Sequence, residues 1–217
     1  MTDITNFLQH QRSHYDAGEL TRANLSIDPV EQFKAWFNDA IAANAMEANA
    51  MNIATVNDSG QPSNRIVLLK GVDENGFVFF TNYKSRKAKE IQNHPLAAIT
   101  FFWPEVHRQV RIEGSLKKVS EKESDEYFKS RPRQSQLGAL ASAQSEVIES
   151  RDILEQRLAG LEKQYPGDNI PRPAHWGGYV LTPNRVEFWQ GRPNRLHDRF
   201  QYSLQKDRSW QIDRLSP

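Results

Sequence analysis

The chain has 217 residues, enough for a well-packed domain, and its 28 basic residues nearly balance its 27 acidic ones, so we expect no nucleic-acid partner. It has no cysteine, which excludes disulfides and thiolate metal sites, and its six histidines show no metal-ligand spacing. It also lacks a secretory signal or an apolar stretch long enough to span a membrane, so we expect a cytoplasmic protein without a membrane partner.

The N-terminal residues 1–24 are polar and without periodicity, so we expect a mobile segment followed by a single domain over residues 25–217. A helix is predicted after this segment. Asp28 is a suitable N-cap and Pro29 suits the first helical position. Helical spacing places five apolar residues on one face, namely Val30, Phe33, Trp36, Phe37 and Ile41.

Further along, the apolar period changes to two, which predicts strands. Asn75-Gly76 lies between two apolar runs and predicts a hairpin. A short helix over 85–95 is expected to start after an N-cap at Ser85 and to end at Pro95. The strands expected on either side of it cover residues 51–56, 65–72, 77–82, 96–103 and 108–119.

Two more helices and a final group of strands are expected in the C-terminal half. Ser120 and Glu123 form a capping box that opens a helix, and Pro132 interrupts it. The apolar spacing predicts a longer helix over residues 145–165, then a loop over 166–178. Strands are expected at 179–190, 195–204 and 209–215. This order favours an α+β fold with a β-barrel or a strongly curled antiparallel sheet.

Cationic residues in two stretches are candidates for anion binding. Arg65 and Lys70 are five residues apart, so on a regular strand they would point to opposite faces; they could equally be strand-end charges that reach water. Arg86 and Lys87 fall in the first turn after the N-cap, where cations oppose the helix dipole. A bound phosphate would reverse that cost, although a solvated helix face remains the alternative.

A third candidate lies on the capped helix. Tyr127 and Arg131 are four residues apart and therefore neighbours on one face, with Ser135 just beyond the proline. A phenol, a guanidinium and a hydroxyl suit a phosphate monoester. Tyr–Arg pairs also decorate many helices, so this pattern alone is weak.

The stretch "QGRPNRLHDRF" at residues 190–200 concentrates positive charge. Strand alternation would put Arg195, His197 and Arg199 on one face, where they repel each other unless an anion lies against them. The alternative is a structural histidine paired with Asp198. The chain has no phosphate-binding P-loop and no dinucleotide, serine-hydrolase or zinc-protease motif.

Together these stretches resemble the pyridoxine (pyridoxamine) 5′-phosphate oxidase family. The matching segments occur in the family's order over nearly the whole chain beyond residue 25, and they include "RIVLLKG", "FFTNYKSRKAKEI", "RQVRIEG", "YFKSRPRQSQLGA", "WGG", "EFWQGRPNRLHDRF" and "WQIDRLSP". The resemblance implies an α+β fold, an antiparallel split β-barrel of the FMN-binding type with flanking helices. It also implies a homodimer with FMN at the subunit interface.

The resemblance also assigns residues to the site. The FMN-binding residues would be Arg65, Ile66, Val67, Leu68, Leu69, Lys70, Phe80, Thr81, Arg86, Lys87, Gln109, Gln144, Ser145, Trp189 and Arg199. The substrate-binding residues would be Arg12, Tyr15, Lys70, Tyr127, Arg131, Ser135, Arg195 and His197, the last two catalytic. Phe80 stands where relatives often carry tyrosine, so only a backbone role is expected there.

The implied activity is FMN-dependent oxidation of pyridoxine 5′-phosphate or pyridoxamine 5′-phosphate to pyridoxal 5′-phosphate. O₂ would be the acceptor, giving H₂O₂, and the amine would also release NH₃. The enzyme would act in the synthesis and salvage of pyridoxal phosphate. A flavin reductase or flavin carrier of the same barrel is the alternative, but it would not need Tyr127, Arg131, Ser135 and "RLHDR" together.

Overall fold

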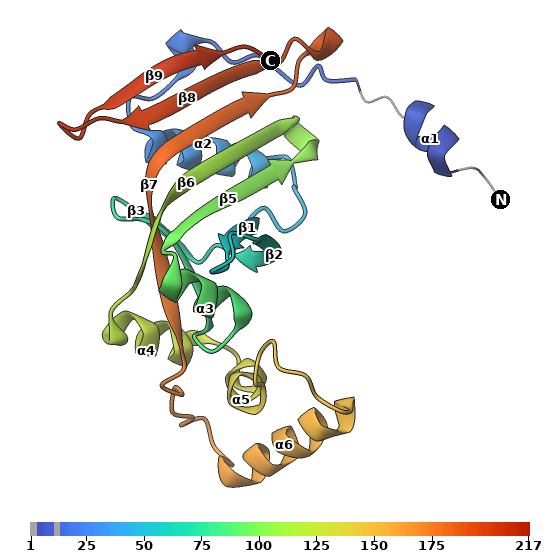
Figure 1. Ribbon diagram of the computed structural model, residues 1–217, viewed down its shortest axis with the longest axis vertical. Helices are drawn as coiled ribbons and strands as arrows, with labels where there is room; N and C mark the ends of the chain where they lie inside the picture. Colours follow the sequence, from blue (N-terminus) through green and yellow to red (C-terminus); the bar gives the residue numbers. More distant parts are fainter. Residues whose placement is uncertain (1–3, 11–13) are drawn as a thin grey trace. The chain divides into compact units, whose positions relative to one another are not determined.

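The computed structural model describes residues 4–10 and 14–217 (Figure 1). Its α-helices are α1 (Ile4–His10), α2 (Pro29–Ala42), α3 (Arg86–Asn93), α4 (Glu121–Ser130), α5 (Arg133–Ala141) and α6 (Arg151–Gln164). Its strands are β1 (Ala50–Val56), β2 (Pro62–Leu68), β3 (Gly71–Asp73), β4 (Gly76–Asn82), β5 (Leu96–Trp103), β6 (Arg108–Lys118), β7 (Trp176–Gln190), β8 (Asp198–Leu204) and β9 (Trp210–Leu215). No helix of the described ranges is long and apolar enough to cross a membrane.

The strands form one sheet in the order β2-β1-β5-β6-β7-β4-β3, with β8 paired to β7 and β9 paired to β8. The pairs β1–β2, β1–β5, β3–β4, β4–β7, β7–β8 and β8–β9 are antiparallel. The predicted hairpin is confirmed, since Asp73 pairs with Gly76 at its end. Helices and an antiparallel sheet in one chain confirm the predicted α+β class.

Contacts divide the chain into two compact units. Unit 1 contains Met1–Ala48, Phe101–Arg111 and Arg185–Pro217, and unit 2 contains Asn49–Thr100 and Ile112–Asn184. Each unit has its own hydrophobic core.

The core of unit 1 is aromatic and forms around α2. The side chain of Asp28 accepts a hydrogen bond from the Val30 N–H at 2.7 Å, which confirms the predicted N-cap. The Phe33 ring lies 4.9 Å from that of Phe101, and the Trp36 ring lies 5.1 Å from that of Phe188. Burial of such rings stabilises the unit by about 1.5–3 kcal/mol each. Ile41, predicted on the same face, is instead 53% exposed.

Unit 2 contains the apolar strands β1 and β4 and a second cluster around α4, α5 and α6. Phe128, Leu137, Ile170 and Trp176 are the buried centre of that cluster. The helix α4 starts after Ser120, whose hydroxyl accepts a hydrogen bond from the Glu123 N–H at 3.1 Å. The helix α4 ends before Pro132, which confirms the predicted interruption, but the sequence pattern did not predict the helix α5 that follows the proline.

Several predicted element boundaries in unit 2 are wrong. Residues 65–72 are not one strand, because the chain leaves β1 after Leu68 and pairs with β4 from Gly71 onward. The long helix begins at Arg151 rather than 145, since Ser145 has a left-handed φ of 75°. The expected loop is shorter, because the "WGG" residues already pair with β4 as the start of β7.

Gly114 in β6 offers a test of the packing in unit 2. A Cβ at this position would lie 2.1 Å from the Thr182 carbonyl oxygen, which is backbone and cannot rotate away. We expect Gly114→Ala to lower the free energy of unfolding by about 1–3 kcal/mol. Gly160→Ala in α6 is the matched control, since a Cβ there meets nothing within 4 Å and should stabilise the helix slightly. Urea denaturation of both variants measures the difference, and equal midpoints would contradict the expectation.

Candidate functional site

The first turn of α3 carries the cations that the sequence selected. The Ser85 hydroxyl accepts a hydrogen bond from the Ala88 N–H, which confirms Ser85 as N-cap and places Arg86 and Lys87 in that turn. Lys87 is 7% exposed, and its Nζ donates to Thr81 Oγ1 at 3.1 Å and to Gln144 Oε1 at 3.2 Å. Thus β4, α3 and the segment before α6 contribute three predicted FMN residues to one contact group.

The Lys87 ammonium is held in an unfavourable environment for a cation. Burial, together with the nearby charge of Arg65, lowers the pKa of Lys87 to about 8, while Glu90 acts in the opposite direction. A buried ammonium beside a guanidinium gains from any anion that binds there. The local electrostatics therefore suit a phosphate.

Arg65 and Arg86 share the carboxylate of Glu90. Arg65 NH2 lies 3.3 Å and Arg86 Nε 2.9 Å from its oxygens. Burial alone would raise the pKa of Glu90, but hydrogen bonds from Thr55, Ser63 and Arg86, with the charge of Arg65, lower this pKa to about 2. The carboxylate is therefore ionised at neutral pH. Sequence reasoning missed Glu90, although its spacing of four from Arg86 was a signal.

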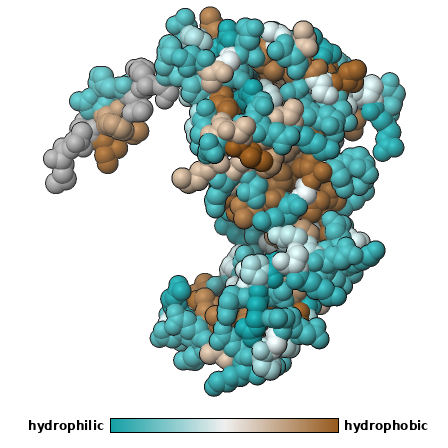
Figure 2. Space-filling model, turned by 180° about the vertical axis from the view of Figure 1, so that it is seen from behind, coloured by the Kyte–Doolittle hydropathy of each residue, from teal (hydrophilic) through white to brown (hydrophobic). Residues whose placement is uncertain are grey.

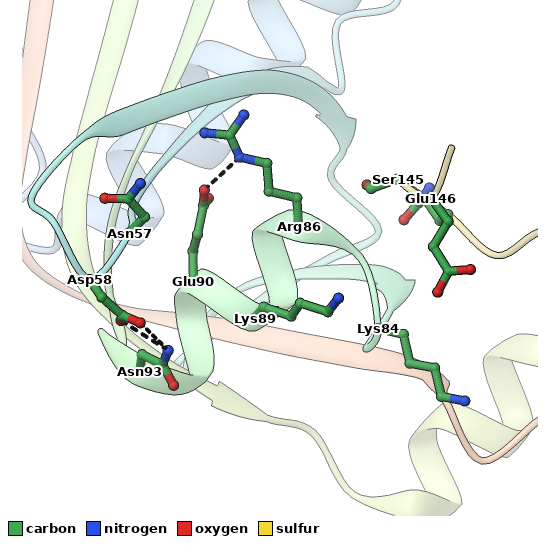
Figure 3. Close-up of a pocket in the computed structure, with 10 residues that line it drawn as sticks. Asn57, Asp58, Lys84, Arg86, Lys89, Glu90, Asn93, Ser145 and Glu146 are labelled. Atoms are coloured by element: carbon green, nitrogen blue, oxygen red, sulfur yellow. Dashed lines mark hydrogen bonds and ion pairs between the residues drawn. The ribbon is translucent and has the colours of Figure 1, made fainter. Parts of the chain in front are cut away.

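A cavity of about 350 Å³ opens beside these residues, and Arg86, Glu90, Gln144 and Ser145 belong to its lining (Figure 3). Figure 3 shows Arg86 and Glu90 reaching toward each other from successive turns of α3. The left-handed φ of Ser145 is strained for a residue with a side chain, and such strain concentrates at functional sites. We name Arg65, Arg86, Lys87 and Glu90 the cationic cluster.

The remaining predicted FMN residues of unit 2 lie near strand ends. Lys70 is exposed and falls between β2 and β3, where its N–H donates to the Val78 carbonyl. The argument that Arg65 and Lys70 point to opposite faces of one strand therefore does not apply. The Phe80 ring stacks on that of Tyr127, with centroids 3.9 Å apart, so its side chain has a packing role besides any backbone role.

The predicted substrate-phosphate residues lie on the aromatic cluster of unit 2. Arg131 is the C-cap of α4 with an extended ψ of 147°, and its guanidinium carbon lies 4.7 Å over the Trp176 ring. Tyr127 stacks nearly parallel to Trp176 at 6.1 Å. Ser135 follows in the first turn of α5. We name Tyr127, Arg131 and Trp176 the aromatic clamp.

Arg131 has an unsatisfied donor. Its NH1 is buried and has no hydrogen-bond partner within residues 4–10 and 14–217. Burial lowers the pKa of Arg131, an effect partly offset by the phenol of Tyr127. An unpaired buried donor costs about 1–3 kcal/mol, and more when it is charged. A bound anion would remove this cost.

In unit 1, Arg199 is engaged with a partner that the sequence did not reveal. Its Nε donates to Glu187 Oε1 at 2.9 Å, and its NH1 donates to the Ser216 carbonyl at 2.7 Å. The hydrogen bond from Arg199 to Glu187 raises the pKa of that arginine. Arg111 lies 3.1 Å from the other oxygen of Glu187. Gln109 lies in β6 and Trp189 in β7.

The predicted strand over residues 195–204 begins only at Asp198. Asn194 and Arg195 have left-handed φ values of 59° and 62°, so Arg195 lies in a turn and alternation does not relate it to Arg199. The alternative of a His197–Asp198 pair is also wrong. Asp198 instead accepts from Arg214 NH1 at 2.7 Å.

His197 belongs to a group of rings that includes a predicted N-terminal residue. Its centroid lies 4.6 Å from that of Trp189 and 5.6 Å from that of Tyr15. Its Nδ1 accepts a hydrogen bond from the Arg192 N–H at 3.1 Å. Burial and the charge of Arg195 lower the pKa of His197, which favours the neutral ring at pH 7. Arg12 lies outside the described residues.

Comparisons with known proteins agree on one family. The family model described as "Pyridoxamine 5′-phosphate oxidase" matches residues 37–165. The model described as "Pyridoxine 5′-phosphate oxidase C-terminal dimerisation region" matches residues 176–217. A pyridoxine/pyridoxamine 5′-phosphate oxidase of Cyanothece is 54% identical over 99% of this chain and 100% of its own length. One of Burkholderia lata is 55% identical over 95% and 97%.

Two solved structures are similar in fold. PhzG from Burkholderia lata, in complex with tetrahydrophenazine-1-carboxylic acid, has a TM-score of 0.86 and 28% identity over 91% of this chain and 98% of its own. An FMN-binding protein of Nostoc punctiforme related to pyridoxamine 5′-phosphate oxidase has a TM-score of 0.70 and 20% identity over 89% and 100%. The fold is that of the FMN-binding split barrels, as expected.

Proposed function

Because the chain belongs to the pyridoxamine 5′-phosphate oxidase family, we propose that it oxidises pyridoxine 5′-phosphate or pyridoxamine 5′-phosphate to pyridoxal 5′-phosphate. O₂ is the final acceptor and is reduced to H₂O₂, and the amine substrate also yields NH₃. The observation that carries the proposal is the buried NH1 of Arg131, which has no hydrogen-bond partner among the described residues, in a guanidinium that lies over a flat aromatic surface. A phosphorylated ring compound complements both its charge and its shape.

The cofactor in this proposal is FMN. The cationic cluster would hold the phosphate of FMN, with Thr81, Gln144 and Ser145 beside it. Residues 65–70, Phe80, Gln109, Trp189 and Arg199 would contact the rest of the flavin. When bound, FMN would supply the acceptor for the two electrons that leave the substrate carbon C4′, and these electrons would then pass to O₂. The chain lacks a dinucleotide motif, which favours FMN over FAD.

The chain's own residues would orient the substrate. Arg131 would bind the substrate phosphate through its unpaired NH1, with the Tyr127 and Ser135 hydroxyls as further partners. Arg195 and His197 would hold the pyridine ring and its phenolic oxygen, and neutral His197 could donate or accept a proton at that oxygen. Lys70, Tyr15 and Arg12 complete the proposed substrate set. Correct orientation is the main contribution expected of the protein.

A homodimer is part of the proposal. The chain matches a C-terminal dimerisation region. In addition, β2 ends the strand order among the described residues, and Ile66 on it is 62% exposed. Hydrophobic side chains also gather in patches on the face drawn in Figure 2. An edge strand with exposed apolar side chains offers a surface on which another chain can pair or pack. Light scattering that gives the mass of one chain for the active protein would contradict the dimer.

PhzG and the flavin reductases define the competing functions. The PhzG structure contains a tricyclic carboxylic acid, and a carboxylate could also bind an arginine. However, the relatives that are 54–55% identical carry the oxidase name. A flavin reductase or flavin carrier would need the cationic cluster but would have no use for the aromatic clamp.

The experiment is to purify the protein, release its cofactor by heat and identify it by chromatography. We expect FMN. Pyridoxine 5′-phosphate added without oxygen should then bleach the visible flavin absorbance, and admitted O₂ should restore it. Bleaching by NADH alone would favour a flavin reductase, and bleaching by tetrahydrophenazine-1-carboxylic acid alone would favour a PhzG-like enzyme. Failure to bind FMN even after reconstitution would refute the proposal.

A further inference from the structure

Glu90 lies at the centre of the cationic cluster, and no comparison assigns it a role. Its carboxylate, 5% exposed, accepts hydrogen bonds from Thr55 Oγ1 at 2.5 Å and Ser63 Oγ at 2.8 Å. Arg65 NH2 at 3.3 Å and Arg86 Nε at 2.9 Å complete its surroundings. Donors from β1, β2 and α3 therefore fix one buried carboxylate in place.

This arrangement leaves part of the Arg86 guanidinium for another partner, whereas both terminal nitrogens of Arg65 already donate to Thr55, Ser63 and Glu90. Arg86 contacts Glu90 through Nε, so its NH1 and NH2 lie outside that ion pair. The Arg86 side chain is 59% exposed and belongs to the lining of the cavity. A guanidinium held at Nε can present its two terminal nitrogens to a phosphate as a fork.

The charge of the cluster also matches a phosphate monoester. Arg65, Arg86 and Lys87 are positive and Glu90 is negative, which leaves two net positive charges. A phosphate monoester carries about −1.5 to −2 at neutral pH. Without the carboxylate, three cations would face one another and would tend to move apart. Other charged residues in the lining of the cavity are Asp58, Lys84, Lys89 and Glu146.

We propose that Glu90 is a positioning residue of the phosphate site, which, together with Arg65 behind it, holds the Arg86 guanidinium at Nε so that its two terminal nitrogens can meet a phosphate group near Lys87. The identity of the ligand, FMN, rests on the proposed function. Glu90 itself does not bind the ligand. It acts through the cations that do.

Glu90→Gln tests this role, because glutamine keeps the size and the hydrogen-bond acceptor but removes the charge. Cofactor-free protein is titrated with FMN, and binding is followed by the loss of flavin fluorescence. We expect affinity to fall about tenfold, the effect of one charge-assisted hydrogen bond. Glu90→Asp keeps the charge, so its affinity for FMN should fall less than that of Glu90→Gln.

The pH profile separates this role from a purely structural one. Anion binding favours protonated Lys87, whose pKa is about 8, so FMN affinity in the unmodified chain should decline as pH rises above about 8. The negative charge of Glu90 favours the protonated form of Lys87. Its removal should therefore shift the decline to lower pH, by about one unit. Glu90→Asp should retain the decline near pH 8.

Two controls show where the effect lies. Glu155→Gln removes an equivalent i,i+4 partner of Arg151, at the same 2.9 Å, but on the exposed surface of α6, and should change nothing. Riboflavin lacks the phosphate, so its affinity should be equal in all variants. Inorganic phosphate is a second probe, read as a rise in melting temperature, and this rise should shrink in Glu90→Gln.

Equal or tighter FMN binding by Glu90→Gln, with an unmoved pH profile and an undiminished phosphate effect, would overturn the inference. The proposed function fails separately. If the unmodified chain binds no FMN but shows a phosphate effect that depends on Glu90, then the cofactor assignment is wrong and the role of Glu90 stands.

Discussion

Replacement of Arg131 by alanine is expected to lower kcat/KM for pyridoxine 5′-phosphate by about 10- to 150-fold, equivalent to about 1.5–3 kcal/mol for one charge-assisted hydrogen bond. The buried NH1 has no partner among the described residues, so the substrate phosphate would supply one. FMN content should stay near normal, because the cationic cluster consists of other residues. Steady-state kinetics on flavin-loaded protein provide the measurement.

Two further variants make the Arg131 result specific. Lys129→Ala removes an exposed cation two residues earlier and should leave kcat/KM unchanged. Arg131→Lys keeps a positive charge but loses the planar fork, so activity should fall to an intermediate level. Loss of flavin with intact substrate kinetics in Arg131→Ala would show that the two phosphate sites have been assigned the wrong way round.

Replacement of Arg195 by methionine is expected to slow flavin reduction by about one to two orders of magnitude, at about 1.4 kcal/mol per tenfold. Methionine keeps most of the stem but deletes the charge and its donors. Arg195 would hold the ring of the substrate against the flavin, so its loss should affect orientation more than binding. Anaerobic stopped-flow bleaching with saturating pyridoxine 5′-phosphate measures the rate.

The backbone conformation at Arg195 requires its own control. Its φ of 62° is unfavourable for arginine and methionine alike, and Arg208 has a similar φ of 69° in the turn before β9. Arg208→Met should therefore show any effect of placing methionine at a left-handed φ, but the rate of flavin reduction should not change. If Arg195→Met reduces the flavin at an unchanged rate, then Arg195 lies in a charged turn that has no catalytic role.

Features that depend on neighbouring residues were predictable from the sequence. The N-caps Asp28, Ser85 and Ser120 each bond to a backbone N–H two or three residues ahead, so a short window of sequence contains the whole interaction. For the same reason the cations in the first turn of α3 could be placed correctly. The hairpin at Asn75-Gly76 is a local signal of the same kind.

Features that depend on distant partners were not predictable. Glu90 belongs to the cationic cluster because Thr55 and Arg65, on two other elements, donate to it. The turn at Arg195 replaces a strand that period-two spacing alone had favoured, since alternation does not report a left-handed φ. Likewise, only the fold shows that Arg199 faces Glu187. Charge patterns thus identified the cations but not the carboxylates that hold them.

The guanidinium of Arg131 over the Trp176 ring has a practical consequence. The indole lies 4.7 Å from a charge whose surroundings would change when an anion binds. Emission from Trp176 should therefore respond to occupancy of the aromatic clamp even when no flavin is present. In a variant with phenylalanine at the other four tryptophans, all tryptophan emission would come from Trp176. The binding of substrate analogues could then be ranked by fluorescence alone.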